Sequence, residues 1–249
     1  MTDALGPAVA RRSAVFGEDA LGAAEAARAI WRRMVRVSWA GFDPYDASLA
    51  SRVPRCLLAT SLRRRLLTQV AKRAPVMLQP VLGVASEVDA YTLGHGVLAA
   101  TRLIGNEVLS HEEIKDETLR MIGALREMAV SRGASVAWGY HFPVDTRFFA
   151  YAPPTPNLIV TAFVVKGLAA ATRTGLADCS REIRGAARFI TDDLPRVADG
   201  FGECVGYVPG EEAVVHNANL LAAMTLCSSA ELCGREEWIN LAVRLARYT

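Results

Sequence analysis

A chain of 249 residues, of which 51% are hydrophobic and 22% charged, has enough apolar side chains to bury a large core as one globular domain. Its formal net charge is only +2, which excludes overall electrostatics as an argument for binding nucleic acid or a membrane surface. The sequence has no apolar run of the roughly 20 residues that a membrane span needs, and its start lacks an export signal. We therefore predict a cytoplasmic protein without a membrane span. Only three of the 28 basic residues are Lys, which is typical of a GC-rich bacterial genome.

The N-terminal part predicts a tail followed by helices. Residues 1–18 are expected to be a loose tail, and residues 19–249 to form one helical domain. The segments 25–39 and 60–73 predict a first, less regular helical hairpin. Between them, GFDPYD at 41–46 predicts a turn, because Asp-Pro and Tyr-Asp favour Asx-type bends.

The helix expected at 62–73 is basic and amphipathic. Its apolar face holds Leu62, Leu66, Leu67 and Val70, and basic residues surround the other face. No aromatic residues interleave with the basic ones, so stacking on nucleic-acid bases is not indicated. We interpret this helix as one with a solvated outer face rather than as a phospholipid or nucleic-acid patch.

An internal repeat organises the rest of the chain. The phrases VLAATRLIG, GLAAATRTG and LCSSAELCG begin at residues 97, 167 and 226, and each ends an apolar helical run with a Gly that fits a helix C-terminus. An amphipathic run follows each phrase. Each unit therefore predicts a buried inner helix followed by a half-exposed outer helix, and we expect about four such hairpins in an all-α fold.

The connections between units also match each other. RGASVAWGYHFP at 132–143 and DGFGECVGYVP at 199–209 both place Gly-Tyr and then Pro after an outer helix. Because both segments run from an outer helix to the next inner helix, we expect them at the same end of the assembly. This end would form a loop-lined mouth.

The repeated hairpins resemble the α/α toroid superfamily, which includes glycan-processing hairpin barrels, terpenoid cyclases and protein prenyltransferases. More narrowly, GFDPYD, WGYHFPVDTR (138–147), PNLIVTAFVVKGL (156–168) and VGYVPGEEAVVHNANLLAA (205–223) resemble a bacterial toroid family often found near polysaccharide-biosynthesis genes. The resemblance implies repeated helical hairpins that form a toroid or a partial toroid. A closed toroid takes about six hairpins, so the chain is a truncated form, or a homodimer completes the ring, or the helices form a smaller unit.

Polar side chains of both connections can converge at the shared mouth. The residues predicted to take part in acid/base catalysis are Asp145, Glu203, His141 and His216. Those predicted to bind substrate are Arg147, Tyr140, Trp138, Tyr207, Asn217, Asn219, Asp43 and Asp46. Helix N-termini and an Arg fork favour an anionic ligand, and aromatic rings suit sugar faces. Each residue also has a structural interpretation, as a packing anchor, a helix cap or half of a local ion pair.

Other chemistries find less support. The only Asp-rich stretch, ITDDLPRVAD at 190–199, lacks the clustered acids that bind magnesium and diphosphate in terpenoid enzymes. The spacing of Cys204, His216 and Cys227 matches no zinc motif, and no glycine loop for phosphate is present. No metal or cofactor is therefore predicted. The five scattered cysteines are expected to be buried, reduced thiols.

Three functions remain open from the sequence. The first is an enzyme of glycan or glycoconjugate metabolism, such as a sugar epimerase, a lyase or a glycoside-hydrolase-like protein, which acts on an acidic sugar. The second is a terpenoid-cyclase-like or prenyltransferase-like enzyme. The third is a non-catalytic scaffold that binds a glycan or a partner protein.

Overall fold

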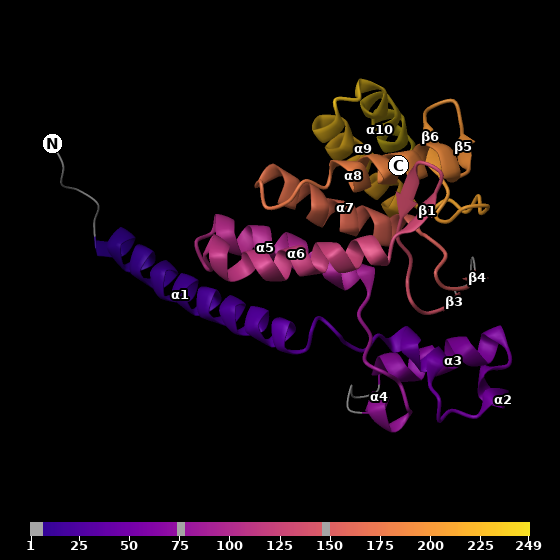
Figure 1. Cartoon of the computed structure of the whole chain (residues 1–249), viewed down its shortest axis with the longest axis horizontal. Helices are drawn as coiled ribbons and strands as arrows, with labels where there is room; N and C mark the ends of the chain where they lie inside the picture. Colours follow the sequence, from indigo (N-terminus) through magenta and orange to yellow (C-terminus); the bar gives the residue numbers. More distant parts are fainter. Residues whose placement is uncertain (1–6, 74–77, 146–149) are drawn as a thin grey trace.

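The computed structural model of the chain describes residues 7–73, 78–145 and 150–249 and is mostly helical, with only short two-stranded pairs (Figure 1). Its elements follow in this order: α1 (Pro7–Arg36), the 3-10 helix η1 (Pro44–Leu49), α2 (Arg55–Leu58), α3 (Ser61–Arg73), α4 (Leu78–Val81), α5 (Ala90–Gly105), α6 (His111–Glu127), β1 (Val130–Arg132), β2 (Ser135–Ala137), β3 (Val144–Asp145), β4 (Ala150–Tyr151), α7 (Leu158–Arg173), α8 (Ser180–Arg188), the π-helix η2 (Phe189–Asp193), β5 (Arg196–Ala198), β6 (Glu203–Val205), α9 (His216–Cys233) and α10 (Glu236–Tyr248).

Helical hairpins with an inner and an outer layer form the body of the molecule. In sequence order, α5 packs on α6, α7 on α8 and α9 on α10, while α5, α7 and α9 pack side by side as the inner layer. Figure 1 shows these hairpins following one another from the centre of the view to its top. Most residues of helix α7 are buried, because it has inner helices on both sides and α8 on a third. The alternation of apolar and amphipathic helices predicted from the repeat is thus observed in this part of the chain.

The helix ends follow local signals in the sequence. Asp89 and Asn157 cap α5 and α7 by accepting hydrogen bonds from the backbone N–H groups of Thr92 and Val160. Gly234 ends α9 in the left-handed conformation, as the repeat predicted. After α5, by contrast, Glu107 takes the positive φ angle of 56°.

The connections between hairpins contain short β-hairpins where the sequence predicted loops. Strands β1 and β2 pair antiparallel after α6, and β5 and β6 pair antiparallel after α8 and η2. The second strand ends shortly before the tyrosine of the Gly-Tyr pair in both connections, three residues before Tyr140 in one and two residues before Tyr207 in the other. The two connections therefore share a backbone pattern as well as a sequence pattern.

The N-terminal part differs from the prediction. Helix α1 begins at Pro7, so the loose tail expected over residues 1–18 is helical from that point, as its Ala- and Arg-rich sequence and the Pro at the first position allow. The first hairpin, expected from 25–39 and 60–73, also differs, because α3 packs mainly on η1 and α1 runs away from it (Figure 1).

Residues 47–86 form a separate small lobe that contains the end of η1 and helices α2, α3 and α4. Its own core consists of Ala50, Val53 and Val84, with Leu58, Leu67 and Leu82 packed against them. Figure 1 shows the lobe below the hairpins, near β3 and β4. Within the described residues, no helix is long and apolar enough to cross a membrane.

Candidate functional site

The two Gly-Tyr connections meet at the N-terminus of α7. The backbone N–H of Asn157 donates to the carbonyl of Trp138 at 2.9 Å, and the N–H of Leu158 donates to the carbonyl of Tyr207 at 3.0 Å. Two adjacent residues at the start of α7 thus bind both connections through backbone hydrogen bonds. Their convergence at one end of the hairpins is as the sequence predicted.

Three tyrosines gather at this end. Side-chain hydrogen bonds join Tyr207 to Tyr140 and to Tyr151. The ring centroids of Tyr151 and Tyr207 lie 6.4 Å apart. Burial is the main reason why the pKa of each phenol is raised above the ordinary tyrosine value, and for Tyr140 and Tyr151 nearby hydroxyls raise it further. All three hydroxyls therefore stay protonated at neutral pH and can donate hydrogen bonds. We call Tyr140, Tyr151 and Tyr207 the tyrosine cluster.

A stack of three rings holds the GFDPYD segment against this cluster. Phe142 lies between Tyr45 and Tyr140, with ring centroids 5.4 Å and 4.8 Å away and interplanar angles of 9° and 14°. Phe142 is buried. The stack positions η1 beside the loop that carries His141.

His141 and Asp46 form a hydrogen-bonded pair at this contact. The Nε2 atom of His141 lies 2.7 Å from Oδ1 of Asp46, whose side chain is only 2% exposed. The other carboxylate oxygen accepts the backbone N–H of Asp43 at 2.7 Å in a capping box at the start of η1. The Nδ1 atom of His141 is enclosed and has no hydrogen-bond partner within the described residues.

Further carboxylates near the pair affect the pKa of His141 and that of Asp43. Burial opposes a charge on His141, but the hydrogen bond to Asp46 and the charges of Asp46, Asp89 and Glu87 outweigh it, so the pKa of His141 is raised. The pKa of Asp43 is also raised, first by burial and then by the charges of Asp46 and Asp89. The site therefore stabilises the protonated form of His141, with Asp46 as its hydrogen-bond acceptor.

Sequence reasoning missed several members of the site. Antiparallel bridging between Gly41 and Glu87 brings the GFDPYD segment alongside Asp89, and Tyr91 contributes to the raised pKa of Tyr140. In the sequence, Asp89 reads as an ordinary N-cap and Tyr91 as part of the first helical turn. Tyr45 and Tyr151 were missed for the same reason, since no local pattern separates them from packing residues.

The predicted carboxylate pair of Asp145 and Glu203 does not share a site in the structure. Asp145 accepts hydrogen bonds from Arg64 at 2.9 Å, from Arg65 at 2.8 Å and from Ser61 at 2.7 Å. Glu203 is paired instead with Arg244 of α10 and Arg196 of β5. Arg64, Arg65 and Arg244 come from distant parts of the chain, which explains the difference from the prediction.

Four other predicted residues lie outside the tyrosine cluster. His216 and Asn217 are exposed at the start of α9, where the His216 ring contacts Tyr248. Asn219 is buried and holds backbone groups of Val205 and Leu245. Trp138 is also buried, and its indole N–H donates to the carbonyl of Leu125. Arg147 lies outside the described residues.

A pocket of about 390 Å³ adjoins the tyrosine cluster. Tyr151 lines it, together with Arg64, Asp145, Pro143 and Val144 from α3, β3 and the preceding loop. A guanidinium and a protonated phenol thus border the same space. Because Arg64 is paired with Asp145, the pocket presents an ion pair rather than a free cation to a polar ligand.

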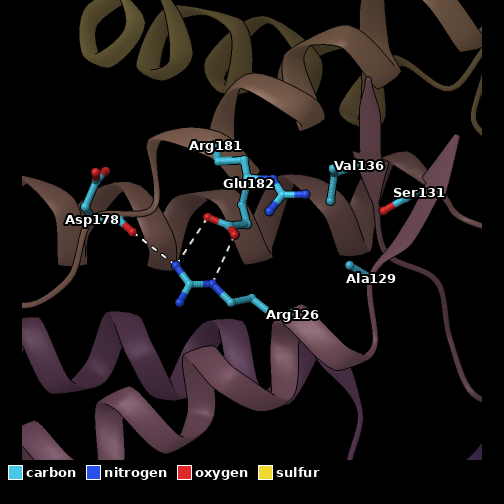
Figure 2. Close-up of a pocket in the computed structure, with 7 residues that line it drawn as sticks. All are labelled: Arg126, Ala129, Ser131, Val136, Asp178, Arg181 and Glu182. Atoms are coloured by element: carbon cyan, nitrogen blue, oxygen red, sulfur yellow. Dashed lines mark hydrogen bonds and ion pairs between the residues drawn. The ribbon is translucent and has the colours of Figure 1, made fainter. Parts of the chain in front are cut away.

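A second pocket, of about 380 Å³, lies between α6, α8 and the β1–β2 hairpin (Figure 2). In it, Arg126 donates to Glu182 at 3.0 Å and to the carbonyl of Asp178 at 3.1 Å. Figure 2 shows these bonds joining the end of α6 to the start of α8. Since the charge of Arg126 is compensated inside the protein, this arrangement fixes one outer helix on the next.

The five cysteines lie in different environments. Cys179 and Cys204 are buried as predicted, but Cys56 and Cys227 are exposed, because α2 belongs to the small lobe and Cys227 lies on an open side of α9. Within the described residues, no group of three or more His, Cys, Asp or Glu side chains is placed to hold a metal ion. Comparison with protein-family models, with curated proteins and with solved structures gave no match.

Proposed function

We propose that the chain is an acid/base enzyme of glycan or glycoconjugate metabolism, with His141 as the group that transfers the proton. The observation that carries this proposal is the 2.7 Å bond between His141 and the buried Asp46, beside an Nδ1 atom that has no hydrogen-bond partner among the residues the structure describes. A carboxylate in this position orients an imidazole and stabilises its charged form. Asp46 is thus a positioning residue and His141 the proposed catalytic residue.

The surroundings of His141 suit a sugar. The protonated hydroxyls of the tyrosine cluster and the carboxylates of Asp43 and Asp89 supply donors and acceptors for sugar hydroxyls, and aromatic rings offer apolar faces. The acidic group of the sugar would lie toward Arg64 in the pocket next to Tyr151. Because Phe142 contacts the His141 ring, a ligand reaches Nδ1 only when the ring stack opens.

The reaction type follows from the groups that are placed together. A hydrolase needs two carboxylates on opposite sides of a glycosidic bond. Asp145 and Glu203 are held in separate ion pairs, so hydrolysis is disfavoured. Proton removal from a carbon next to a sugar carboxylate, as in an epimerase or a lyase, uses the neutral imidazole of His141, in which Nε2–H donates to Asp46 and Nδ1 accepts the proton. The terpenoid alternative is disfavoured by the acids and the His at the loop end, since that chemistry needs an apolar cavity.

We also propose that the fold is an α/α toroid. The inner layer of α5, α7 and α9 and the outer layer of α6, α8 and α10 are the arrangement that such a ring repeats. We propose that a second copy of the chain completes the ring. Analytical ultracentrifugation tests this, and a monomer at micromolar concentration would contradict it.

Solvent-exchange experiments test the chemistry. We would incubate the protein in D₂O with uronic acids and their nucleotide-linked forms and follow exchange at carbon by NMR, with absorbance for unsaturated lyase products. Exchange by the wild type and by His216→Gln, but not by His141→Gln, would support the proposal. His216 is the matched control because it is exposed and lies outside the tyrosine cluster. A wild-type protein that binds these sugars without exchange, or that neither binds them nor catalyses exchange, would contradict the proposal.

A second candidate is a non-catalytic scaffold that binds a glycan or a partner protein. It is favoured by the rings of Tyr45, Phe142 and Tyr140, which stack on one another and fill the loop end. The scaffold predicts ligand-dependent thermal stabilisation that survives His141→Gln. If His141→Gln loses both the ligand-dependent stabilisation and the solvent exchange, the enzyme is favoured instead.

A further inference from the structure

The lobe of residues 47–86 has a charge unlike that of the rest of the chain. It contains seven of the 28 basic residues and none of the 26 acidic ones, so it carries +7 while the remaining residues carry −5. The small net charge of the whole chain therefore hides a strongly cationic region. Long-range attraction to anionic surfaces depends on this local charge rather than on the net charge.

Most of this charge is free to act outside the protein. Arg64 and Arg65 are paired with Asp145. The other five basic residues are exposed, and within the described residues none of them forms an ion pair with a carboxylate; these are Arg52, Arg55, Arg63, Lys72 and Arg73. Arg63 and Arg73 donate only to oxygens of neighbouring residues in the lobe.

Helix α3 presents its large apolar residues to solvent. Leu62, Leu66 and Val70 are 67%, 58% and 65% exposed, and their spacing of four residues places them on one face of the helix. The face turned toward the lobe buries Thr68 and Ala71 instead. The basic residues Arg63, Lys72 and Arg73 are exposed as the sequence predicted, but the apolar stripe of the helix is exposed as well.

We propose that this face of α3 docks on a bilayer that contains anionic phospholipids. A stripe of aliphatic side chains bordered by Arg is the pattern by which helices lie in the headgroup region, with apolar groups inserted and cations at the phosphates. Two further exposed aliphatic residues of the lobe, Leu49 and Val81, add apolar surface. The inference concerns where the protein acts and stands independently of the reaction proposed for His141.

Other occupants fit the surface less well. A second copy of the lobe would bring +7 against +7, which opposes a symmetric contact. Single-stranded nucleic acid is bound with aromatic side chains that stack on bases, and residues 47–86 contain no Phe, Trp or Tyr. Neither occupant explains why three large aliphatic side chains stay exposed between basic residues.

Vesicle flotation with the full chain tests the proposal. We expect at least about tenfold stronger partition to vesicles of phosphatidylcholine with 30% phosphatidylglycerol than to phosphatidylcholine alone, and loss of that difference at about 0.5 M salt. The triple variant Leu62→Ser, Leu66→Ser, Val70→Ser should lower partition about tenfold. The control is Ile239→Ser with Val243→Ser, which removes exposed apolar residues of α10.

A charge variant keeps the test valid if the triple variant unfolds, which circular dichroism would reveal. Arg63→Glu with Arg73→Glu should weaken binding to anionic vesicles, whereas Arg132→Glu at an exposed site of β1 should not. Equal partition to both vesicle types would overturn the proposal. So would unchanged vesicle binding by a folded triple variant, or binding of a single-stranded oligonucleotide as tight as that of the vesicles.

Discussion

Gly94 of α5 and Gly167 of α7 meet backbone to backbone where the two inner helices cross. A Cβ atom built on Gly167 would overlap the carbonyl oxygen of Gly94, and one built on Gly94 would lie 2.8 Å from the Cα of Val164. These contacts involve backbone atoms, which cannot turn aside as a flexible side chain can. The spacing of α5 and α7, and hence of Asp89 and Asn157 at their N-termini, depends on this pair.

Gly167→Ala should therefore separate the inner helices and lower the free energy of unfolding by about 1 to 3 kcal/mol. Gly123→Ala in α6 is the matched control, because a Cβ there meets nothing within 4 Å. That variant should raise the free energy of unfolding by up to about 1 kcal/mol through helix propensity. Urea denaturation of both variants measures the difference, and the same sign for both would contradict the close contact.

The His141–Asp46 pair predicts a pH dependence of stability. The pKa of His141 is raised in the folded state above its ordinary value of 6.5, so its stabilising contribution is complete below pH 6.5 and is lost as the pH rises through the folded-state pKa. The stability difference between wild type and His141→Gln should thus shrink from pH 5.5 to 8.5. Urea denaturation across this range measures it. A stability difference that widens over this pH range would refute the pairing.

Tyr207→Phe should remove the hydroxyl that joins Tyr140 and Tyr151. Two buried phenols would then lose a hydrogen-bond partner, at a cost of about 1 to 3 kcal/mol in the free energy of unfolding. Tyr248→Phe removes a hydroxyl from the partly exposed ring beside His216 and should change stability by less than about 0.5 kcal/mol. If both variants lower the free energy of unfolding equally in denaturation experiments, the tyrosine cluster makes no specific contribution to stability.

Asp145→Asn should loosen the lobe. Asp145 is 10% exposed, and although burial opposes its charge, hydrogen bonds from Ser61, Arg65 and Arg64 keep its pKa below the ordinary value of 3.8. Its contribution is present above pH 3.8 and disappears as the pH falls through the folded-state pKa. Because the arginines are partly exposed, we expect a loss of only about 1 to 2 kcal/mol at pH 7.

Limited trypsin digestion measures this loosening, since the lobe contains seven basic residues. Asp145→Asn should speed cleavage between residues 52 and 73. Glu231→Gln breaks the more exposed ion pair with Arg173 and should leave the cleavage rate unchanged. Protection of the lobe in Asp145→Asn would show that another contact holds it in place.

The sequence predicted those features of the fold that repeat along the chain. The Gly-Tyr pairs indicated that Tyr140 and Tyr207 belong to equivalent connections, and the structure places both at the start of α7. Apolar periodicity separated inner from outer helices, because burial on several sides removes the polar face. His141, Asp43 and Asp46 were candidates from their motifs, and they are in contact or adjacent in the structure.

The partners of the charged residues could not be predicted in this way. Asp145 was predicted as a catalytic carboxylate, but Arg64 and Arg65 reach it from a helix about 80 residues earlier in the chain. The exposure of the apolar face of α3 could not be predicted either, because its sequence pattern is the same whether that face is buried or exposed. A local pattern shows which residues share a face, but the surrounding fold decides which way that face points.

The repeated connections have an evolutionary consequence. Each hairpin boundary of this kind delivers one tyrosine, Tyr140 or Tyr207, to the same end of the molecule. A tandem duplication of one unit would therefore add a phenol to the cluster, and a deletion would remove one. Gene duplication could thus have built the tyrosine cluster together with the framework that supports it.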